Sequence, residues 1–332
     1  MKKILVTGGL GYIGSHTVVE LVNHGYEPVI VDDLSNTSLN MLEGIKSITG
    51  QDIPFFKEDV RNIDAMSTIL KDNNIQAVIH FAAFKAVGES VQEPLKYYDN
   101  NIGGLVNLLK AMKAAHVKNI VFSSSCTVYG EPDVSPVNEQ SPIKKANSPY
   151  GNTKQIGEEI LADCQFLNTV ALRYFNPIGA HASAQIGELP LGVPNNLIPY
   201  ITQTAAGIRE KLTVFGSDYN TKDGTCIRDY IHVTDLAIAH VKSLDYIEKH
   251  PDNQFEIFNI GTGNGLTVLE IIQAFENVNQ LKLNYSIGPR RAGDVEKVWA
   301  DASKAKQILG WTAHLDLNEM VRSAWAWQQN LK

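Results

Sequence analysis

The fold of this chain is decided by Thr7-Gly8-Gly9-Leu10-Gly11-Tyr12-Ile13-Gly14, a glycine-rich turn between an apolar run and a helical pattern. Glycines let the backbone turn tightly and approach a pyrophosphate, and a helix that starts there presents free N–H groups to the anion. We therefore expect Gly8, Gly11 and Gly14 to bind a dinucleotide. A strand–helix turn that merely needs glycine is the alternative.

The first 175 residues alternate short apolar runs with helical patterns. Runs such as Val29-Ile30-Val31 are apolar at every position, which is typical of strands buried on both faces of a parallel sheet. Helices between such strands give a Rossmann-like, doubly wound α/β fold. The expected strands cover residues 2–7, 28–32, 53–57, 76–81, 119–124 and 168–175, and the expected helices cover 13–24, 38–49, 62–72, 95–115 and 150–164.

Asp32 ends the second expected strand, 18 residues beyond Gly14. A carboxylate at this place accepts hydrogen bonds from ribose hydroxyls and repels a 2′-phosphate. The next basic residue is Lys46, so the sequence favours NAD over NADP. Asp32 as a simple turn residue is the alternative. Ligands bind outside the carboxyl ends of such strands, where the chain also carries Asp59, Val60, Phe81, Ala82 and Lys85.

The alternation of apolar runs and helical patterns becomes less regular after about residue 176, and Pro and Gly are frequent through residue 195. Shorter elements follow, with helices expected near 197–207, 234–249, 267–277 and 317–330 and strands near 212–215, 255–260 and 281–286. We expect residues 1–175 to form the NAD-binding domain, to which some later segments return. Residues 176–332 are then mainly a smaller C-terminal α/β lobe for the substrate.

Composition excludes several classes of protein. The formal net charge of −7, without a long basic run, disfavours nucleic-acid binding. No segment has the length and hydropathy of a membrane span, and the first residues run directly into a strand, leaving no room for a signal peptide. Three scattered cysteines (Cys126, Cys164, Cys226) fit neither a metal site nor a disulfide framework. We expect no metal and a cytoplasmic location.

Tyr150 and Lys154 lie four residues apart at the start of an expected helix, so both side chains project from one face. A phenol has a pKa of about 10, and a neighbouring ammonium lowers it by stabilising the phenolate. The pair is therefore a candidate acid–base unit, although a Tyr–Lys pair on a solvated helix has the same spacing. Ser125 follows the fifth strand and supplies a hydroxyl at the same edge of the sheet, which favours catalysis.

Eight segments resemble the UDP-glucose 4-epimerases (UDP-galactose 4-epimerases) of the extended short-chain dehydrogenase/reductase superfamily. They are TGGLGYIGSH at 7–16, HFAAFKAVGESVQEPLKYYDNN at 80–101, SSSCTVYG at 123–130, SPYGNTK at 148–154, LRYFNPIGAH at 172–181, PNNLIPY at 194–200, RDYIHV at 228–233 and Arg290-Arg291-Ala292-Gly293-Asp294. The likeness extends over essentially the whole chain.

The resemblance implies a role for each matching residue. Tyr150 is the expected base, Lys154 holds the nicotinamide ribose, and Ser125 bonds the sugar. The expected NAD contacts also include Tyr12, Ile13, Asp32, Asn36, Asp59, Val60, Phe81, Ala82, Lys85, Asn100 and Phe175. The expected UDP-sugar contacts are Asn176, Asn196, Arg228, Arg291 and Asp294. Guanidinium groups suit a diphosphate, although any single Arg could form a surface ion pair instead.

The resemblance implies interconversion of UDP-galactose and UDP-glucose through a transient 4-keto sugar. Sugar-nucleotide dehydratases of the superfamily place an Asp-Glu pair where this chain has Cys126 and Thr127, so elimination is disfavoured. Another UDP-sugar enzyme, such as a uronate epimerase or decarboxylase, is an open alternative. A non-catalytic NAD-sensing protein is a further one, but it is expected to lose the Ser125, Tyr150 and Lys154 set.

Val298 precedes Trp299-Ala300-Asp301, at the position that lines the sugar pocket in the family. Enzymes strict for glucose and galactose tend to carry Tyr there, so Val298 predicts room for an N-acetyl group; plain packing is the alternative. The helices over 95–115 and 150–164 carry exposed-looking apolar residues, and family members commonly pair through them. We expect a homodimer, although core packing explains Leu105, Leu108, Ile156 and Ile160 equally well.

Overall fold

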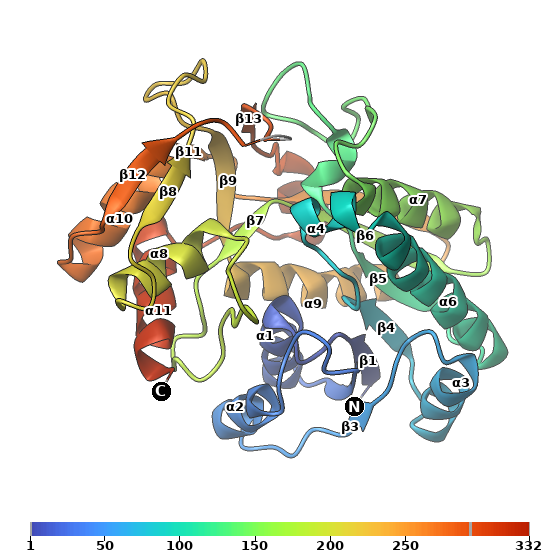
Figure 1. The fold of residues 1–332 in the computed structure, drawn as a ribbon. Coiled ribbons are helices and arrows are strands. Elements are labelled where there is room, and N and C mark those ends of the chain that lie inside the picture. The colour runs from blue at the N-terminus through green and yellow to red at the C-terminus, as the bar shows by residue number, and fades with distance from the viewer. Residues whose placement is uncertain (1, 292–293, 332) are drawn as a thin grey trace.

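The computed structural model describes residues 2–291 and 294–331. Its centre is a seven-stranded sheet in the order β10-β6-β5-β4-β1-β2-β3, with every neighbouring pair parallel (Figure 1). Its strands are β1 (Lys3–Thr7), β2 (Glu27–Asp32), β3 (Phe55–Lys57), β4 (Ala77–His80), β5 (Asn119–Ser123), β6 (Asn168–Tyr174) and β10 (Phe255–Ile260). The expected doubly wound α/β fold is confirmed.

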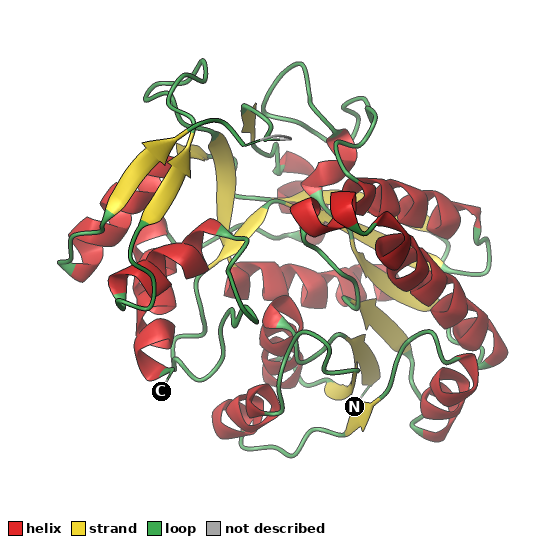
Figure 2. Ribbon diagram, in the orientation of Figure 1, coloured by secondary structure: helices red, strands yellow, loops and turns green. Residues whose placement is uncertain are grey.

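Successive residues of the central strands enter two different cores, because side chains alternate across a strand. Ile4 and Val6 of β1 belong to one buried cluster and Leu5 to the other. This explains why the strands are apolar at every position, since helices cover both faces of the sheet (Figure 2). The first cluster packs against α1 (Tyr12–Asn23), α2 (Asn40–Thr49) and α9 (Val233–Lys249), and the second against α3 (Ile63–Asp72), α6 (Gly104–Ala114) and α7 (Pro149–Asp163).

From β1 the strand order runs to one edge of the sheet through β2 and β3. The chain then returns to the other side of β1, where β4 pairs, and continues to the opposite edge. The carboxyl ends of β1 and β4 therefore flank the crevice in which such folds bind ligands. β10 pairs with β6 and α9 packs on α1, so two segments beyond residue 176 belong to the large sheet and its helices.

The smaller lobe contains two small sheets, seen beside the large one in Figure 1. In the first, β9 (Ile227–His232) pairs with β7 (Asn176–Ile178), β11 (Gly265–Thr267) and β13 (Lys297–Val298); the second joins β8 (Leu212–Phe215) to β12 (Tyr285–Gly288). A third core lies among them and α8 (Leu197–Ala205), α10 (Val268–Asn279) and α11 (Leu317–Asn330).

The helix expected over residues 95–115 is wrong as one element. The structure divides it into α5 (Pro94–Tyr97), a π-helical turn η1 (Tyr98–Gly103) and α6. The Asn101 side chain bonds the backbone N–H and C=O of Phe84 and the Thr153 hydroxyl, and such tertiary bonds are not visible in sequence spacing. Leu105 and Leu108 are not exposed but belong to the second core, so core packing explains both.

Other elements differ from expectation in smaller ways. The strand expected over residues 281–286 begins later, as β12, and β7, β9, β11 and β13 were not expected at all. Three short helical segments were also missed, namely α4 (Val87–Gln92), η2 (Cys126–Tyr129) and η3 (Ala305–Leu309). Among residues 2–291 and 294–331, no helix is long and apolar enough to cross a membrane.

Candidate active site

The glycine turn after β1 closes tightly beneath the start of α1. Gly8 has a φ of +68°, and a Cβ on it would lie 2.8 Å from the backbone nitrogen of Ala82 after β4. A Cβ on Gly14 would lie 2.2 Å from the carbonyl oxygen of Gly8. No side chain caps the N-terminus of α1 at Gly11, so the first N–H groups of the helix are free for an anion. This turn fits the pyrophosphate of a dinucleotide.

Asp32 adjoins the glycine turn from the end of β2. Its carboxylate accepts hydrogen bonds from the backbone N–H of Leu10 at 3.1 Å and of Leu34 at 3.0 Å, and only 8% of the residue is exposed. Burial raises the pKa of Asp32, and the two N–H bonds lower it. A fixed acceptor beside the turn suits ribose hydroxyls. Asn36, four residues further on, is exposed.

The other predicted cofactor residues lie after β3, β4 and β6, at the start of α1 and in η1. Asp59 pairs with Arg61 at 2.6 Å, and Val60 is buried in the second core. Phe81 packs on His240, with 4.6 Å between ring centroids. Tyr12 donates its hydroxyl to Gly179 O (2.6 Å), Asn100 donates to the Asn101 side chain (3.0 Å), and Ile13, Ala82 and Phe175 are half-buried or buried.

Ser125, Tyr150 and Lys154 are brought together where β5 ends. Ser125 caps the short helix η2, and its hydroxyl accepts a hydrogen bond from Thr127 N at 3.2 Å. Ser148 caps α7 through Gly151 N at 3.1 Å, which places Tyr150 in the first turn of that helix. Relative exposures of 6%, 8% and 4% show that all three residues are enclosed.

The charges of Tyr150 and Lys154 are set mainly by burial. Burial raises the pKa of Tyr150 well above its usual value, and a hydrogen bond with Ser125 lowers it. Burial lowers the pKa of Lys154 to about 8, and Glu158 raises it. Lys154 Nζ lies 5.9 Å from the Tyr150 ring centroid and donates to Ser123 O at 2.6 Å. Burial therefore opposes the lowering of the Tyr150 pKa that was expected from the pair.

Tyr174 adjoins this group and was not predicted from the sequence. Its hydroxyl shares a hydrogen bond with Ser123 Oγ at 2.6 Å, and its phenol contributes to raising the pKa of Tyr150. Its position at the carboxyl end of β6, directly before Phe175, is the sequence feature that could have identified it as a site residue.

Three predicted substrate residues lie on the small sheet that faces this end of β5. Asn176 in β7 pairs in register with Tyr230 of β9, and Arg228 of β9 pairs with Val298 of β13. The Arg228 guanidinium donates to Ile227 O at 2.8 Å. Burial raises the pKa of Cys126, and the positive charge of Arg228 is a smaller cause that lowers it. Arg228 is therefore close to the residue that follows Ser125.

The remaining substrate residues contact other protein groups. Arg291 pairs with Asp294 at 2.7 Å, with side-chain exposures of 55% and 14%, and Ala292 and Gly293 between them lie outside the described residues. Asn196 donates to Glu188 at 2.6 Å, and Lys85, a predicted cofactor residue, donates to the same carboxylate oxygen at 3.0 Å. Glu188 was not predicted, and it links the two sets.

Val298 packs in a fourth apolar cluster rather than on the surface. It is 6% exposed and shares the cluster with Val128 and Tyr129 of η2 and with Phe175, the predicted cofactor residue. Its side chain thus lies between the segment after Ser125 and the end of β6. Over the described ranges, no group of three or more His, Cys, Asp or Glu side chains could hold a metal ion.

The arrangement combines a dinucleotide turn, an enclosed Ser–Tyr–Lys group, the Arg228 guanidinium on the facing sheet and the Arg291 guanidinium between β12 and β13. Beside a nicotinamide, a buried phenol, a buried ammonium and a hydroxyl can move the proton of an alcohol oxygen while hydride leaves or returns at the carbon that bears this oxygen. The guanidinium groups can hold an anionic substrate.

Known proteins resemble this chain over nearly its whole length. A family model described as GDP-mannose 4,6 dehydratase matches residues 5–324. The chain is 51% identical to the UDP-glucose 4-epimerase of Bacillus subtilis over 331 residues, which cover 98% of this chain and 97% of the relative.

Two solved structures are similar over nearly their whole length. The UDP-glucose-4-epimerase of Stenotrophomonas maltophila, with bound NAD and formylated UDP-arabinopyranose, has a TM-score of 0.96 and 49% identity, covering 99% of this chain and 98% of that one. The UDP-glucose 4-epimerase of Bifidobacterium longum, in complex with NAD+ and UDP, has a TM-score of 0.95 and 46% identity, with 99% of each chain covered.

Proposed function

This chain belongs to the UDP-glucose 4-epimerase family, and from that premise we infer how its residues carry out the epimerisation. The activity is NAD-dependent and interconverts UDP-galactose and UDP-glucose through a transient 4-keto sugar. The observation that carries the assignment of residues is the enclosed group of Ser125, Tyr150 and Lys154 beside the glycine turn.

Tyr150 takes the proton of the sugar 4-hydroxyl and later returns it. Bound NAD⁺ would supply a hydride acceptor for carbon 4, its reduced form would supply the hydride for the other face, and its positive ring charge would favour the phenolate. Ser125 bonds the same sugar oxygen and, through its hydrogen bond to Tyr150, lowers the phenol pKa. Lys154, protonated below its pKa of about 8, supplies a further positive charge near the phenol at neutral pH.

Residues of the large sheet hold the cofactor in this proposal. The free N–H groups at the start of α1 bind the pyrophosphate, and Asp32 accepts hydrogen bonds from a ribose. The tight packing of Gly8 against Ala82 leaves no room for a side chain between the two strand ends. We assign NAD binding to residues 1–175, together with the segments that return to that sheet.

The small lobe, mainly within residues 176–332, anchors the uridine diphosphate. Arg228 and Arg291 supply guanidinium groups for the phosphates, and Asp294 can accept hydrogen bonds from uridine hydroxyls. Asn176 and Asn196 supply further polar contacts. Anchoring at the nucleotide lets the 4-keto sugar turn while it stays bound, so hydride can return to its opposite face.

The dehydratase activity in the description of the family model is disfavoured by the residues after Ser125. Elimination of water needs an acid at this place, and the chain has Cys126 and Thr127. Burial raises the pKa of Cys126 to about 11, so its thiol is a poor proton donor at neutral pH. Redox-neutral epimerisation needs no such acid beyond Tyr150.

Substrate range, assembly and location are finer parts of the proposal. Val298 lacks the bulk of a tyrosine beside the segment after Ser125, so we include UDP-N-acetylhexosamines among the substrates.

A homodimer is supported by the side chains of Val91 and Leu95, which are 60% and 81% exposed beside α7. A cytoplasmic location is supported by three cysteines, all of them free.

The assay is conversion of UDP-galactose by the purified protein without added cofactor. We expect turnover in the wild type and its loss, by at least about a hundredfold, in Tyr150→Phe with NAD still bound. Tyr285→Phe, at a 40% exposed tyrosine of β12, is the matched control and keeps its activity. Near-normal turnover in Tyr150→Phe contradicts the proposed role of the phenol.

A further inference from the structure

Polar contacts on both sides of Ser125 join helix α7 to the last residue of β5 and to the segment that follows it. Before it, Lys154 Nζ donates to Ser123 O at 2.6 Å, and the Ser124 hydroxyl donates to Glu158 Oε1. After it, Gln155 Nε2 donates to Val128 O at 2.8 Å. Ser125 is thus held relative to the helix that carries Tyr150.

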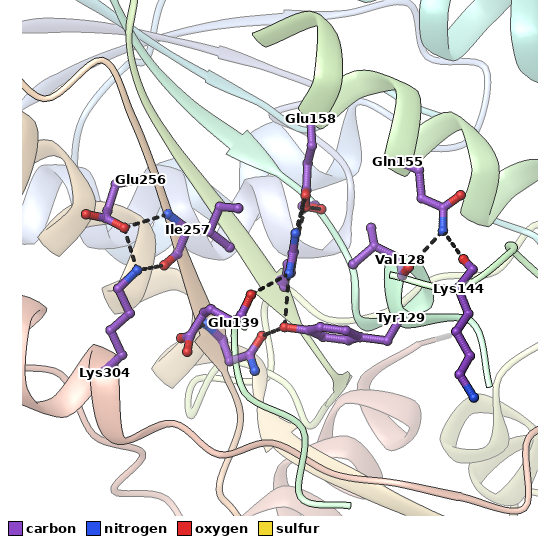
Figure 3. A network of polar contacts seen from close by, with 12 residues as sticks. Val128, Tyr129, Glu139, Lys144, Gln155, Glu158, Glu256, Ile257 and Lys304 are labelled. Atoms are coloured by element: carbon purple, nitrogen blue, oxygen red, sulfur yellow. Dashed lines mark hydrogen bonds and ion pairs between the residues drawn. The ribbon is translucent and has the colours of Figure 1, made fainter. Parts of the chain in front are cut away.

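Glu158 is the carboxylate among these contacts and is itself held by Arg173 of β6. The guanidinium donates from Nη2 to Oε2 at 2.6 Å and from Nε to Oε1 at 2.9 Å, and the two side chains are 4% and 7% exposed. Arg173 Nη1 also donates to the hydroxyl of Tyr129 at 3.2 Å, which donates to Asn259 at 2.6 Å (Figure 3).

A buried ion pair is often no more stabilising than apolar residues of the same volume. Stability alone therefore does not explain the Glu158–Arg173 pair. A second effect of Glu158 is on Lys154, which lies on the same helix, α7. Lys154 is one turn before Glu158, so both side chains lie on one face of α7. Glu158 raises the pKa of Lys154, against the larger lowering by burial.

The other groups that face Lys154 do not supply a negative charge near neutral pH. His80 of β4 has a pKa lowered to about 3 by burial and by Lys154, so it is neutral. Phe122 of β5 lies 5.0 Å from Nζ, and Tyr150 of α7 is a phenol whose pKa burial raises. On β6, Arg173 is a cation whose guanidinium donates to both oxygens of Glu158. Among these groups, Glu158 is the carboxylate that raises the pKa of Lys154.

We propose that Glu158 is a positioning residue for the reaction: held by Arg173 and Ser124, it keeps Lys154 charged and fixes Ser125 relative to Tyr150. The inference rests on the proposed function for its catalytic meaning. Glu158 does not touch the sugar or the cofactor in this scheme, and it acts only through its neighbours.

The test variant is Glu158→Gln, which keeps a hydrogen-bond acceptor for Ser124 and removes the charge. We expect the Lys154 titration, followed by NMR of the labelled side chain and assigned with Lys154→Met, to move to lower pH by about one pH unit. The alkaline limb of kcat for UDP-galactose moves the same way, while KM changes less than about twofold. A purely structural role lowers the folded fraction and leaves the shape of the profile unchanged.

Glu158→Gln leaves Arg173 buried without its carboxylate partner, so the single variant can fail to fold. In that case the same measurements are made on the double variant Glu158→Gln/Arg173→Met. The matched control is Glu256→Gln/Lys304→Met, an ion pair between β10 and the segment before η3 (Figure 3). An unchanged Lys154 titration in the folded variants, or an equal shift in the control, overturns the proposal. A wild type that does not convert UDP-galactose contradicts the proposed function instead, and the NMR titration still decides this inference.

Discussion

Glu188 accepts a hydrogen bond from Lys85, with 3.0 Å between Oε1 and Nζ. The same oxygen accepts from Asn196 at 2.6 Å. Lys85 follows a strand of the large sheet, and Asn196 begins a helix of the small lobe. One carboxylate therefore joins a predicted NAD contact to a predicted UDP contact.

We predict that Glu188→Gln binds UDP more tightly. The substitution removes a negative charge from beside the binding groups of an anionic ligand, which at low ionic strength corresponds to about a threefold lower Kd. Stability changes little, because the pair is partly exposed on the lysine side. Calorimetric titration with UDP measures the effect. Glu248→Gln, in the Lys2–Glu248 pair, is the control and leaves Kd unchanged; weaker binding in Glu188→Gln contradicts the prediction.

The glycine turn gives a second prediction, since the space at its glycines differs sharply from that at Gly88. A Cβ on Gly14 would lie 2.2 Å from Gly8 O, whereas a Cβ on Gly88 would meet nothing within 4 Å. We expect Gly14→Ala to lose copurified NAD and to unfold at lower temperature, because the turn must open. Gly88→Ala keeps both properties. Absorbance of extracted NAD and thermal unfolding measure them, and full NAD retention in Gly14→Ala would count against the turn as the pyrophosphate site.

Buried histidines make the fold sensitive to acid. Burial lowers the pKa of His16 and His80 to about 3 and that of His232 and His240 to about 4. Their pKa in the unfolded chain is about 6.5. The unfolded state therefore binds more protons below that pH, and the free energy of unfolding falls as pH decreases. At about pH 5 the loss is about 2 kcal/mol for each histidine.

His240→Gln tests this dependence, because it removes one of the four titrating groups. Urea unfolding near neutral pH and at about pH 5 should show a smaller loss of stability than in the wild type. Asp229 and Asp235, whose pKa values burial raises, offset part of the loss at still lower pH in both proteins. His250→Gln, at an exposed histidine, is the control for the loss of an imidazole. Equal dependence in His240→Gln and the wild type refutes the assignment.

The sequence could predict the large sheet because its signal is local. Runs such as Ile120-Val121-Phe122 are apolar at each position since both faces are covered, and Asp32 stands at a strand end as expected. β9 was missed because its residues include Arg228 and Asp229. The Asp229 carboxylate is fully buried only because Thr262, Gly263 and Ala300 donate to it from distant segments.

The residues of the candidate site could be selected from the sequence, but their charges could not. Tyr150 and Lys154 were chosen from their spacing on one helix, and in the structure Tyr150 contacts Ser125 while Lys154 contacts Ser123. The direction of the Tyr150 pKa depends on burial, and that of Lys154 also depends on Glu158. Burial of this kind comes from elements far apart in the chain, which periodicity does not reveal.

Val298 gives the prediction about substrate range. We expect the wild type to interconvert UDP-GlcNAc and UDP-GalNAc as well as the two hexoses, because valine leaves more space than tyrosine where β13 meets η2. Val298→Tyr fills that space with a ring in a position that is only 6% exposed. We expect a loss of about 10- to 100-fold in kcat/KM for the N-acetylhexosamines, and less than about tenfold for UDP-galactose.

Val298→Phe separates bulk from hydrogen bonding, since it adds the ring without the hydroxyl. If space alone decides, both variants discriminate against the acetamido group to the same degree, and Val298→Leu behaves as the wild type does. Coupled assays that follow each pair of UDP-sugars at equal enzyme concentration give the ratios directly. A wild type that leaves UDP-GlcNAc unchanged, or a Val298→Tyr variant that still converts it, shows that Val298 acts as packing for Phe175 and Val128 and does not limit the sugar.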